Sequence, residues 1–182
     1  TRDELTVNLS KYILLEGDWA GIDADDNIMM AQGKYNLELF GMKTIIATGY
    51  ASLDYHTNFA GTTDDRSLFM VAIQTNKGNH KIGFDYIASD AYAENTSMIL
   101  MAKTNLKGHS VVAWYYDVEG NSTLSSELSQ DNFPFSVGFS GFRIQLGFKL
   151  FDNIGTDLRY YAQTLDGGEE LSRIQLNMNI TF

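Results

Sequence analysis

The sequence predicts an all-β fold: an antiparallel up-and-down β-barrel of about ten strands, formed as one domain by residues 1–182. Polar and apolar residues alternate in many segments of roughly ten residues, as in a strand with two different faces. The connections between these segments alternate between long and short. Aromatic residues, which favour strands, are frequent, whereas proline, which cannot donate to a sheet ladder, occurs once, at Pro134.

Ten segments fit the strand pattern. In chain order they are residues 5–15, 31–39, 43–53, 66–75, 79–88, 95–104, 109–118, 140–151, 155–165 and 171–182. The alternation is clearest in "FRIQLGFKL", where the apolar positions run from Phe142 to Leu150. In "SLFMVAIQ" and "MILMAK" both faces are apolar, so the pattern leaves the register of these two strands open.

The connections fall into two classes. The short ones, residues 40–42, 76–78, 105–108 and 152–154, each contain Gly, Asn or Asp, which suit tight hairpins. The long ones, residues 16–30, 54–65, 89–94, 119–139 and 166–170, are rich in acidic and small polar residues. Alternate connections of an up-and-down sheet lie at opposite ends, so one end should carry tight turns and the other the long loops, as in outer-membrane barrels.

Composition excludes several classes of protein. The net charge of -10 argues against binding to nucleic acid, whose phosphates would be repelled. The absence of cysteine excludes disulfides and thiolate chemistry. No segment approaches the ~20 consecutive apolar residues of a spanning helix.

Alternation alone does not say which face meets water. A soluble lipocalin-like carrier of an apolar ligand would have its apolar face inside. Strands of about ten residues match the thickness of a bilayer, and apolar-face aromatics near the strand ends resemble two interfacial girdles. We place Phe148 and Phe182 in the lower girdle and Tyr86, Trp114 and Tyr116 in the upper one. These features favour an outward apolar face and therefore a transmembrane barrel.

The end of the chain carries a family resemblance. The last segment, "RIQLNMNITF", alternates from Arg173 onward and ends on Phe182. It resembles the C-terminal assembly signal of Gram-negative outer-membrane barrels, and the last quarter of the chain, from "GFRIQLGFKL" onward, resembles the end of bacterial porins. Those porins are usually much longer than 182 residues, so the chain is either a complete ten-strand barrel or the C-terminal part of a larger one.

The resemblance implies a location and an activity. It implies a channel of the cell outer membrane that lets small hydrophilic solutes or ions diffuse passively, with no cofactor. The implied partners are outer-membrane lipid and lipopolysaccharide, the barrel assembly machinery, small solutes and, as an option, further copies of the chain.

With the apolar faces outward, the polar faces line the lumen. The lumen-lining candidates are Lys34, Glu38, Asp85, Arg143, Lys149, Asp157, Arg159 and Arg173. Counting residues from the short turns puts Arg143 and Arg173 at one level, with Arg159 lower. The arginines either contact solutes or pair with carboxylates such as Asp157 and fill a narrow barrel. A filled barrel would serve as an anchor or adhesion scaffold.

Two weaker motifs predict no further chemistry. In "DADDN", Asp23, Asp25 and Asn27 have the first spacings of a calcium loop, but Ile28 and Lys34 replace the required Gly and Glu. Asp54 and His56 resemble the Asp and His at the rim of omptin-like proteases, but one such pair is not a catalytic site. We therefore expect neither a metal site nor an enzyme.

Overall fold

The computed structural model describes residues 4–15, 26–54, 66–120, 122 and 138–181, which form ten strands and no helix. In chain order the strands are β1 (Glu4–Leu15), β2 (Asp26–Leu39), β3 (Met42–Asp54), β4 (Arg66–Lys77), β5 (His80–Ser89), β6 (Thr96–Leu106), β7 (His109–Val118), β8 (Phe139–Phe151), β9 (Ile154–Leu165) and β10 (Glu170–Ile180). All ten predicted strands are confirmed. The largest difference is in β2, which begins at Asp26 instead of residue 31. None of the described residues forms a helix long and apolar enough to span a bilayer.

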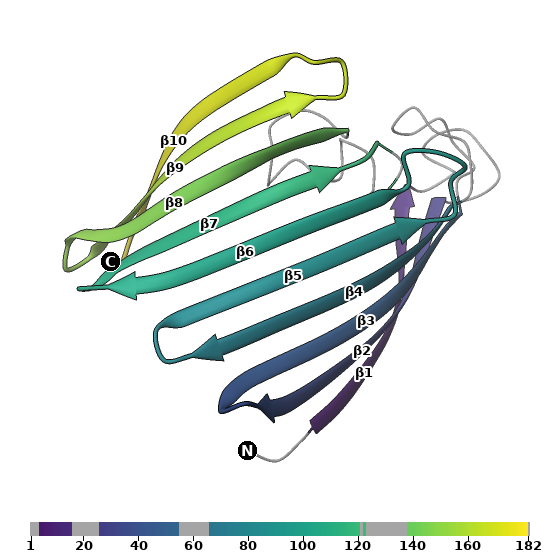
Figure 1. Ribbon diagram of the computed structural model, residues 1–182, viewed down its shortest axis with the longest axis horizontal. Coiled ribbons are helices and arrows are strands. Elements are labelled where there is room, and N and C mark those ends of the chain that lie inside the picture. Colours follow the sequence, from purple (N-terminus) through teal and green to yellow (C-terminus); the bar gives the residue numbers. More distant parts are fainter. Residues whose placement is uncertain (1–3, 16–25, 55–65, 121, 123–137, 182) are drawn as a thin grey trace.

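The strands form one antiparallel sheet in sequential order, from β1 at one edge to β10 at the other (Figure 1). Each strand pairs with the next along the chain, so the predicted up-and-down topology is confirmed. In the described residues β1 and β10 do not pair with each other. The observed fold is therefore an open ten-stranded sheet.

The two classes of connection lie at opposite edges of the sheet. The tight turns lie at one edge, on the left of Figure 1, and the other connections join strands at the opposite edge. Phe40 and Gly41, like Lys107 and Gly108, both have positive φ, the backbone of a two-residue hairpin whose twist matches its strands. Below, the side of the sheet formed by the strand ends that carry the tight turns is called the turn edge, and the side formed by the opposite strand ends is called the loop edge. Neither name refers to the edge strands β1 and β10.

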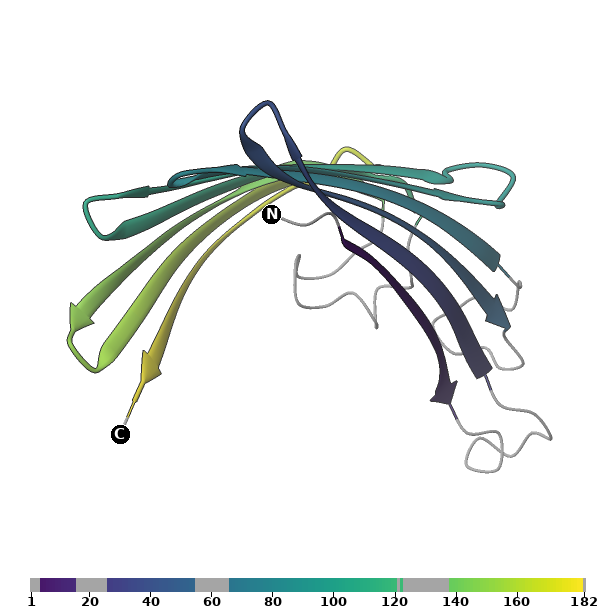
Figure 2. The same ribbon diagram turned by 90° about the horizontal axis from the view of Figure 1, so that it is seen from below.

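The sheet bends into an arch, with β1 and β10 at its two ends (Figure 2). Buried side chains lie almost entirely on the face that carries Arg143, including Leu53, Tyr116 and Gln163. Because side chains on the inner side of an arch converge, this face is the concave one. The register also settles the two ambiguous segments. In "SLFMVAIQ", Leu68 and Met70 face the concave side and Phe69 and Val71 the convex side. In "MILMAK", Ile99 and Met101 face the concave side and Met98 and Leu100 the convex side.

The concave face has two apolar clusters near the loop edge. One consists of Ile28, Ala51, Leu53 and Leu68, and the other of Tyr116, Val118, Phe139 and Tyr161. Polar and charged side chains occupy this face closer to the turn edge, among them Asp157 and Arg159. Along the strand direction, only the part of the concave face nearer the turn edge is therefore polar, whereas the alternation predicts a concave face that is polar throughout.

The convex face is apolar and exposed along all ten strands. Its exposed side chains include Leu9 (78%), Leu100 (42%), Ile144 (45%) and Leu176 (58%). Five exposed aromatic residues lie three or four residues from the loop-edge end of their strands, namely Tyr50, Phe69, Tyr86, Tyr115 and Phe142. We call these five residues the upper aromatic belt.

Gly141 in β8 has no room for a side chain. A Cβ atom built on Gly141 would lie 2.7 Å from Gln163 Cα and would also overlap Ala162 O, both in the backbone of β9. We expect Gly141→Ala to destabilise the protein by about 1–3 kcal/mol, because β8 and β9 must separate to relieve the clash. The denaturant midpoint of unfolding measures this loss. Gly155→Ala is the matched control, since its Cβ would meet only Asn179 O at 4.0 Å; equal midpoints for the two variants would contradict the expected clash.

Candidate functional site

The eight lumen-lining candidates all lie on the concave face. Directly opposed residues of adjacent strands project to the same side of a sheet. Lys34 opposes Ala47, Ala47 opposes Ala72, and Ala72 opposes Asp85, which places Lys34 and Asp85 in one row. The same reasoning joins the other six candidates to this face, namely Glu38, Arg143, Lys149, Asp157, Arg159 and Arg173.

Arg143 and Arg173 lie on one row across three strands. Tyr161 in β9 opposes Arg143 in β8 on one side and Arg173 in β10 on the other. Arg159 lies two residues closer to the turn edge, opposite Gln145 and Gln175. This arrangement agrees with the heights counted from the sequence.

The guanidinium of Arg143 is stacked on an aromatic ring. Its Cζ atom lies 3.6 Å from the centroid of the Trp114 ring and 5.9 Å from that of Tyr161. Cation–π contacts of this kind are stronger when the cation is desolvated, and Arg143 is only 8% exposed. Arg143 is therefore a buried cation held in place on the concave face, whereas Arg173 on the same row is exposed.

Arg159 belongs to a polar network. Its Nε donates to Asp157 Oδ1, and Asn177 Nδ2 donates to the same oxygen at 3.1 Å. Gln175 Nε2 donates to Asn177 Oδ1 at 2.7 Å. Of the two interpretations offered by the sequence, pairing with a carboxylate therefore describes Arg159.

Two predicted girdle residues lie on the wrong face. Trp114 and Tyr116 oppose Arg143 and Gly141, so both are on the concave face, and Tyr116 packs on Phe139 with ring centroids 6.3 Å apart. "WYY" has three successive aromatics and thus no visible alternation; the register makes Tyr115 the convex member. Tyr86 and Phe148 lie on the convex face as predicted, and Phe182 is outside the described residues.

Sequence reasoning missed Gln163, a buried polar residue of this region. Gln163 is 5% exposed, and neither its Oε1 nor its Nε2 has a hydrogen-bond partner. A buried amide without partners costs free energy. Its position follows from the tight packing over Gly141, which no sequence pattern reveals.

The weaker motifs gain no support. Asp54 ends β3 at the loop edge, and His56 lies outside the described residues, as do Asp23 and Asp25. Within the part of the chain that the structure describes, no three His, Cys, Asp or Glu side chains are placed to hold a metal ion.

Glu119 holds two connections together at the loop edge. Its Oε2 accepts hydrogen bonds from the backbone N and the Oγ1 of Thr96, both at 2.8 Å. These donors stabilise the carboxylate and lower the pKa of Glu119. The contact joins the start of β6 to the residue that follows β7.

Comparison of the chain with protein-family models, with curated proteins and with solved structures gives no significant match.

The Glu119 contact predicts a pH dependence. A carboxylate with a lowered folded-state pKa adds stability above the unfolded-state value, near 4.5, and this stability is lost as the pH falls through the folded-state pKa. We expect hydrogen-exchange protection of the Thr96 amide, corrected for intrinsic rates, to be constant above pH 4.5 and to fall below it. In Glu119→Gln the protection of the Thr96 amide should be weaker at neutral pH and independent of pH. Identical pH profiles of protection for the wild type and the variant would contradict a stabilising role of the Glu119–Thr96 hydrogen bonds.

Proposed function

We propose that this chain forms all or part of the wall of an outer-membrane β-barrel that acts as a porin-like channel. Small hydrophilic solutes or ions would cross it by passive diffusion. The observation that carries the proposal is the convex face, which is apolar and exposed across all ten strands.

An exposed apolar face of this width needs a cover. Burial of apolar surface contributes about 25 cal/mol per Å², and soluble monomers rarely expose contiguous apolar patches beyond a few hundred Å². A bilayer covers a curved sheet on its outer side and leaves the inner side to water. The upper aromatic belt also suits a membrane–water interface, where amphipathic rings are enriched.

The edges of the sheet also favour a closed wall. In lipid every backbone N–H and C=O must be paired, so an open edge strand cannot remain in the hydrocarbon region. Pairing of β1 with β10, or of each with further strands, would leave neither edge strand unpaired. The strand ends at the turn edge would then face the periplasm and those at the loop edge the exterior, as in outer-membrane barrels.

The mechanism needs no chemical step. Arg173 is exposed on the concave face, and the network around Asp157 neutralises much of the charge of Arg159. Exposed side chains such as Arg173 and Lys149 would set ion selectivity by direct electrostatic contact with permeating ions. The partners would be lipid, lipopolysaccharide, the barrel assembly machinery and small solutes.

A second candidate is a filled barrel that serves as an anchor or adhesion scaffold. The two apolar clusters on the concave face favour it, because they occupy space that an open channel would leave to water. A soluble carrier of an apolar ligand fits less well. It would place Ile144 and Leu176 inside, and both lie on the convex face.

Planar-bilayer conductance tests the channel directly. We expect current from the inserted protein, and we expect Arg173→Gln to shift the reversal potential in a salt gradient toward cations. Arg143→Gln should give a smaller shift, because Arg143 is buried against Trp114. Lys77→Gln is the control, since Lys77 ends β4 at the turn edge, outside the concave face. Folded, inserted protein without current would contradict the channel and favour the filled barrel.

A further inference from the structure

Two lysines oppose each other directly on the concave face. Lys81 in β5 is the register partner of Lys103 in β6. The same row continues from Lys103 through Val112 and Gln145 to Arg159, which places both lysines on the concave face. Like charges in directly opposed positions destabilise a sheet. Lys81 and Lys103, called the lysine pair below, therefore have an electrostatic cost unless a negative charge offsets it.

The protein supplies little negative charge close to the lysine pair. None of the described side chains directly or diagonally next to it on the concave face is acidic. Within the described part of the chain, neither ammonium group forms an ion pair or a hydrogen bond. Asp85 lies four residues from Lys81 on β5, and the side chain of Met101 covers Gly83 between them. Asp85 attracts Lys81, but one carboxylate at this separation leaves the lysine pair with net positive charge.

Strand β4 adds uncharged donors beside the lysine pair. Asn76 opposes Lys81 directly, and Gln74 lies two residues away on the same face of β4. In the part of the chain that the structure describes, neither side-chain amide has a hydrogen bond. Lys43, on the other side of Asn76, is itself opposed by Glu38, so these two charges balance. The lysine pair and the two amides, all half-buried, are called the donor cluster below.

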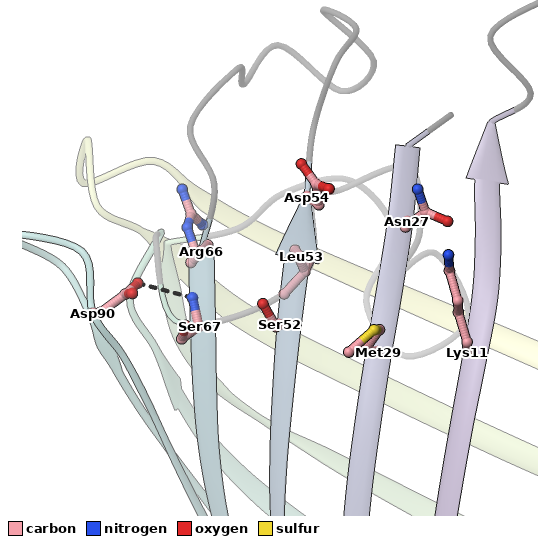
Figure 3. A pocket seen from close by; sticks show the side chains of 9 residues that line it. All are labelled: Lys11, Asn27, Met29, Ser52, Leu53, Asp54, Arg66, Ser67 and Asp90. Atoms are coloured by element: carbon pink, nitrogen blue, oxygen red, sulfur yellow. Dashed lines mark hydrogen bonds between the residues drawn. The ribbon is translucent and has the colours of Figure 1, made fainter. Parts of the chain in front are cut away.

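The charged pocket at the loop edge differs from the donor cluster. Side chains of both faces line it, with Lys11 and Arg66 as cations and Asp54 and Asp90 as carboxylates (Figure 3). These opposite charges balance, so the pocket has no electrostatic preference for an anion. The donor cluster combines two cations with two amide groups and contains no carboxylate, so it does have this preference.

We propose that the donor cluster binds a small solute that carries a dianionic phosphate group. Directly opposed side chains have Cβ atoms about 4.5–5.5 Å apart, so the ammonium groups of Lys81 and Lys103 can both reach the oxygens of one phosphate. Each would donate a charge-assisted hydrogen bond of about 2.8 Å. Asn76 and Gln74 would donate to the remaining oxygens. Two negative charges match the two lysines, whereas a chloride ion offsets only one of them.

The site rests on the proposed function in one respect, because the concave face must be open to solutes at the level of the lysine pair. Bound phosphate would remove the repulsion between Lys81 and Lys103 and would name the class of solute that this face prefers. Inorganic phosphate and phosphate monoesters share the required chemistry.

Equilibrium dialysis of the detergent-solubilised protein against radiolabelled inorganic phosphate tests the site. We expect saturable binding by the wild type. The affinity should fall about tenfold in Lys81→Gln and in Lys103→Gln, because each variant loses one charge-assisted contact. Lys103→Arg keeps the charge and should retain most of the affinity. An excess of sulfate, another dianion, should displace the phosphate, whereas the same concentration of chloride should not.

Unlabelled glycerol phosphate distinguishes the two sources of the phosphate group. Displacement of the radiolabel by glycerol phosphate would extend the site to phosphate monoesters. Binding of inorganic phosphate without such displacement would confine the site to the free ion, and both results support it.

Lys149→Gln is the matched control, because it removes the same charge from the same face. Lys149 lies in β8, two strands from Lys103 and four residues closer to the turn edge than Gln145, the residue of β8 on the row of the lysine pair. Four residues span ~13 Å along a strand, beyond the screening length of ~8 Å at physiological salt. Lys149→Gln should therefore bind phosphate like the wild type. Equal affinity of the wild type and both lysine-pair variants, an equal loss in Lys149→Gln, or displacement by chloride would overturn the assignment.

Thermal unfolding provides a second measurement. A ligand that binds only the folded protein raises the midpoint of unfolding, so phosphate should raise the midpoint of the wild type more than that of Lys103→Gln. Without phosphate the variant should unfold no earlier than the wild type, because the repulsion within the lysine pair is removed. An equal rise in both proteins would contradict the site.

Planar-bilayer conductance distinguishes the phosphate site from the channel. Conducting wild-type protein that binds no phosphate would refute the site and leave the channel standing. Protein that binds phosphate and inserts without current would refute the channel and leave the site standing.

Discussion

The structure depends on one constraint: an antiparallel ladder pairs the backbone but leaves one apolar face of the sheet uncovered. Backbone groups of neighbouring strands satisfy each other from β1 to β10, so the sheet needs nothing more along its interior strands. Its side chains are sorted by the period of two into a concave and a convex set. The apolar convex set has no second layer of described residues above it, and the proposed function covers it with lipid.

The concave face is organised by height. Near the loop edge it is packed with apolar and aromatic side chains, and Arg143 is held there by the ring of Trp114. Closer to the turn edge, Asp157, Arg159 and Asn177 form a hydrogen-bonded network. Arg143 therefore contributes to packing on the concave face, whereas Arg173 on the same face is exposed.

Much of the fold could be predicted from the sequence, because alternation is a local signal. It located all ten strands, and the spacing of Gly, Asn and Asp located the tight turns. It was insufficient where neighbours are chemically alike: in "WYY" only the pairing of Trp114 with Arg143 shows which ring faces inward. The burial of Gln163 over Gly141 depends on contacts between strands, which a single sequence does not encode visibly. Closure of the sheet depends on the pairing of its two edge strands.

The contact of the convex face with lipid is tested most directly by labelling successive residues of β10. Single cysteines at positions 174 to 178, each carrying an environment-sensitive fluorophore, would be compared in protein inserted into lipid vesicles. We expect labels at Ile174, Leu176 and Met178 to be quenched by lipid-soluble quenchers and those at Gln175 and Asn177 by water-soluble ones, since these two sets lie on opposite faces. Uniform quenching by the water-soluble reagent along β10, or the reverse alternation, would contradict a lipid-facing convex surface.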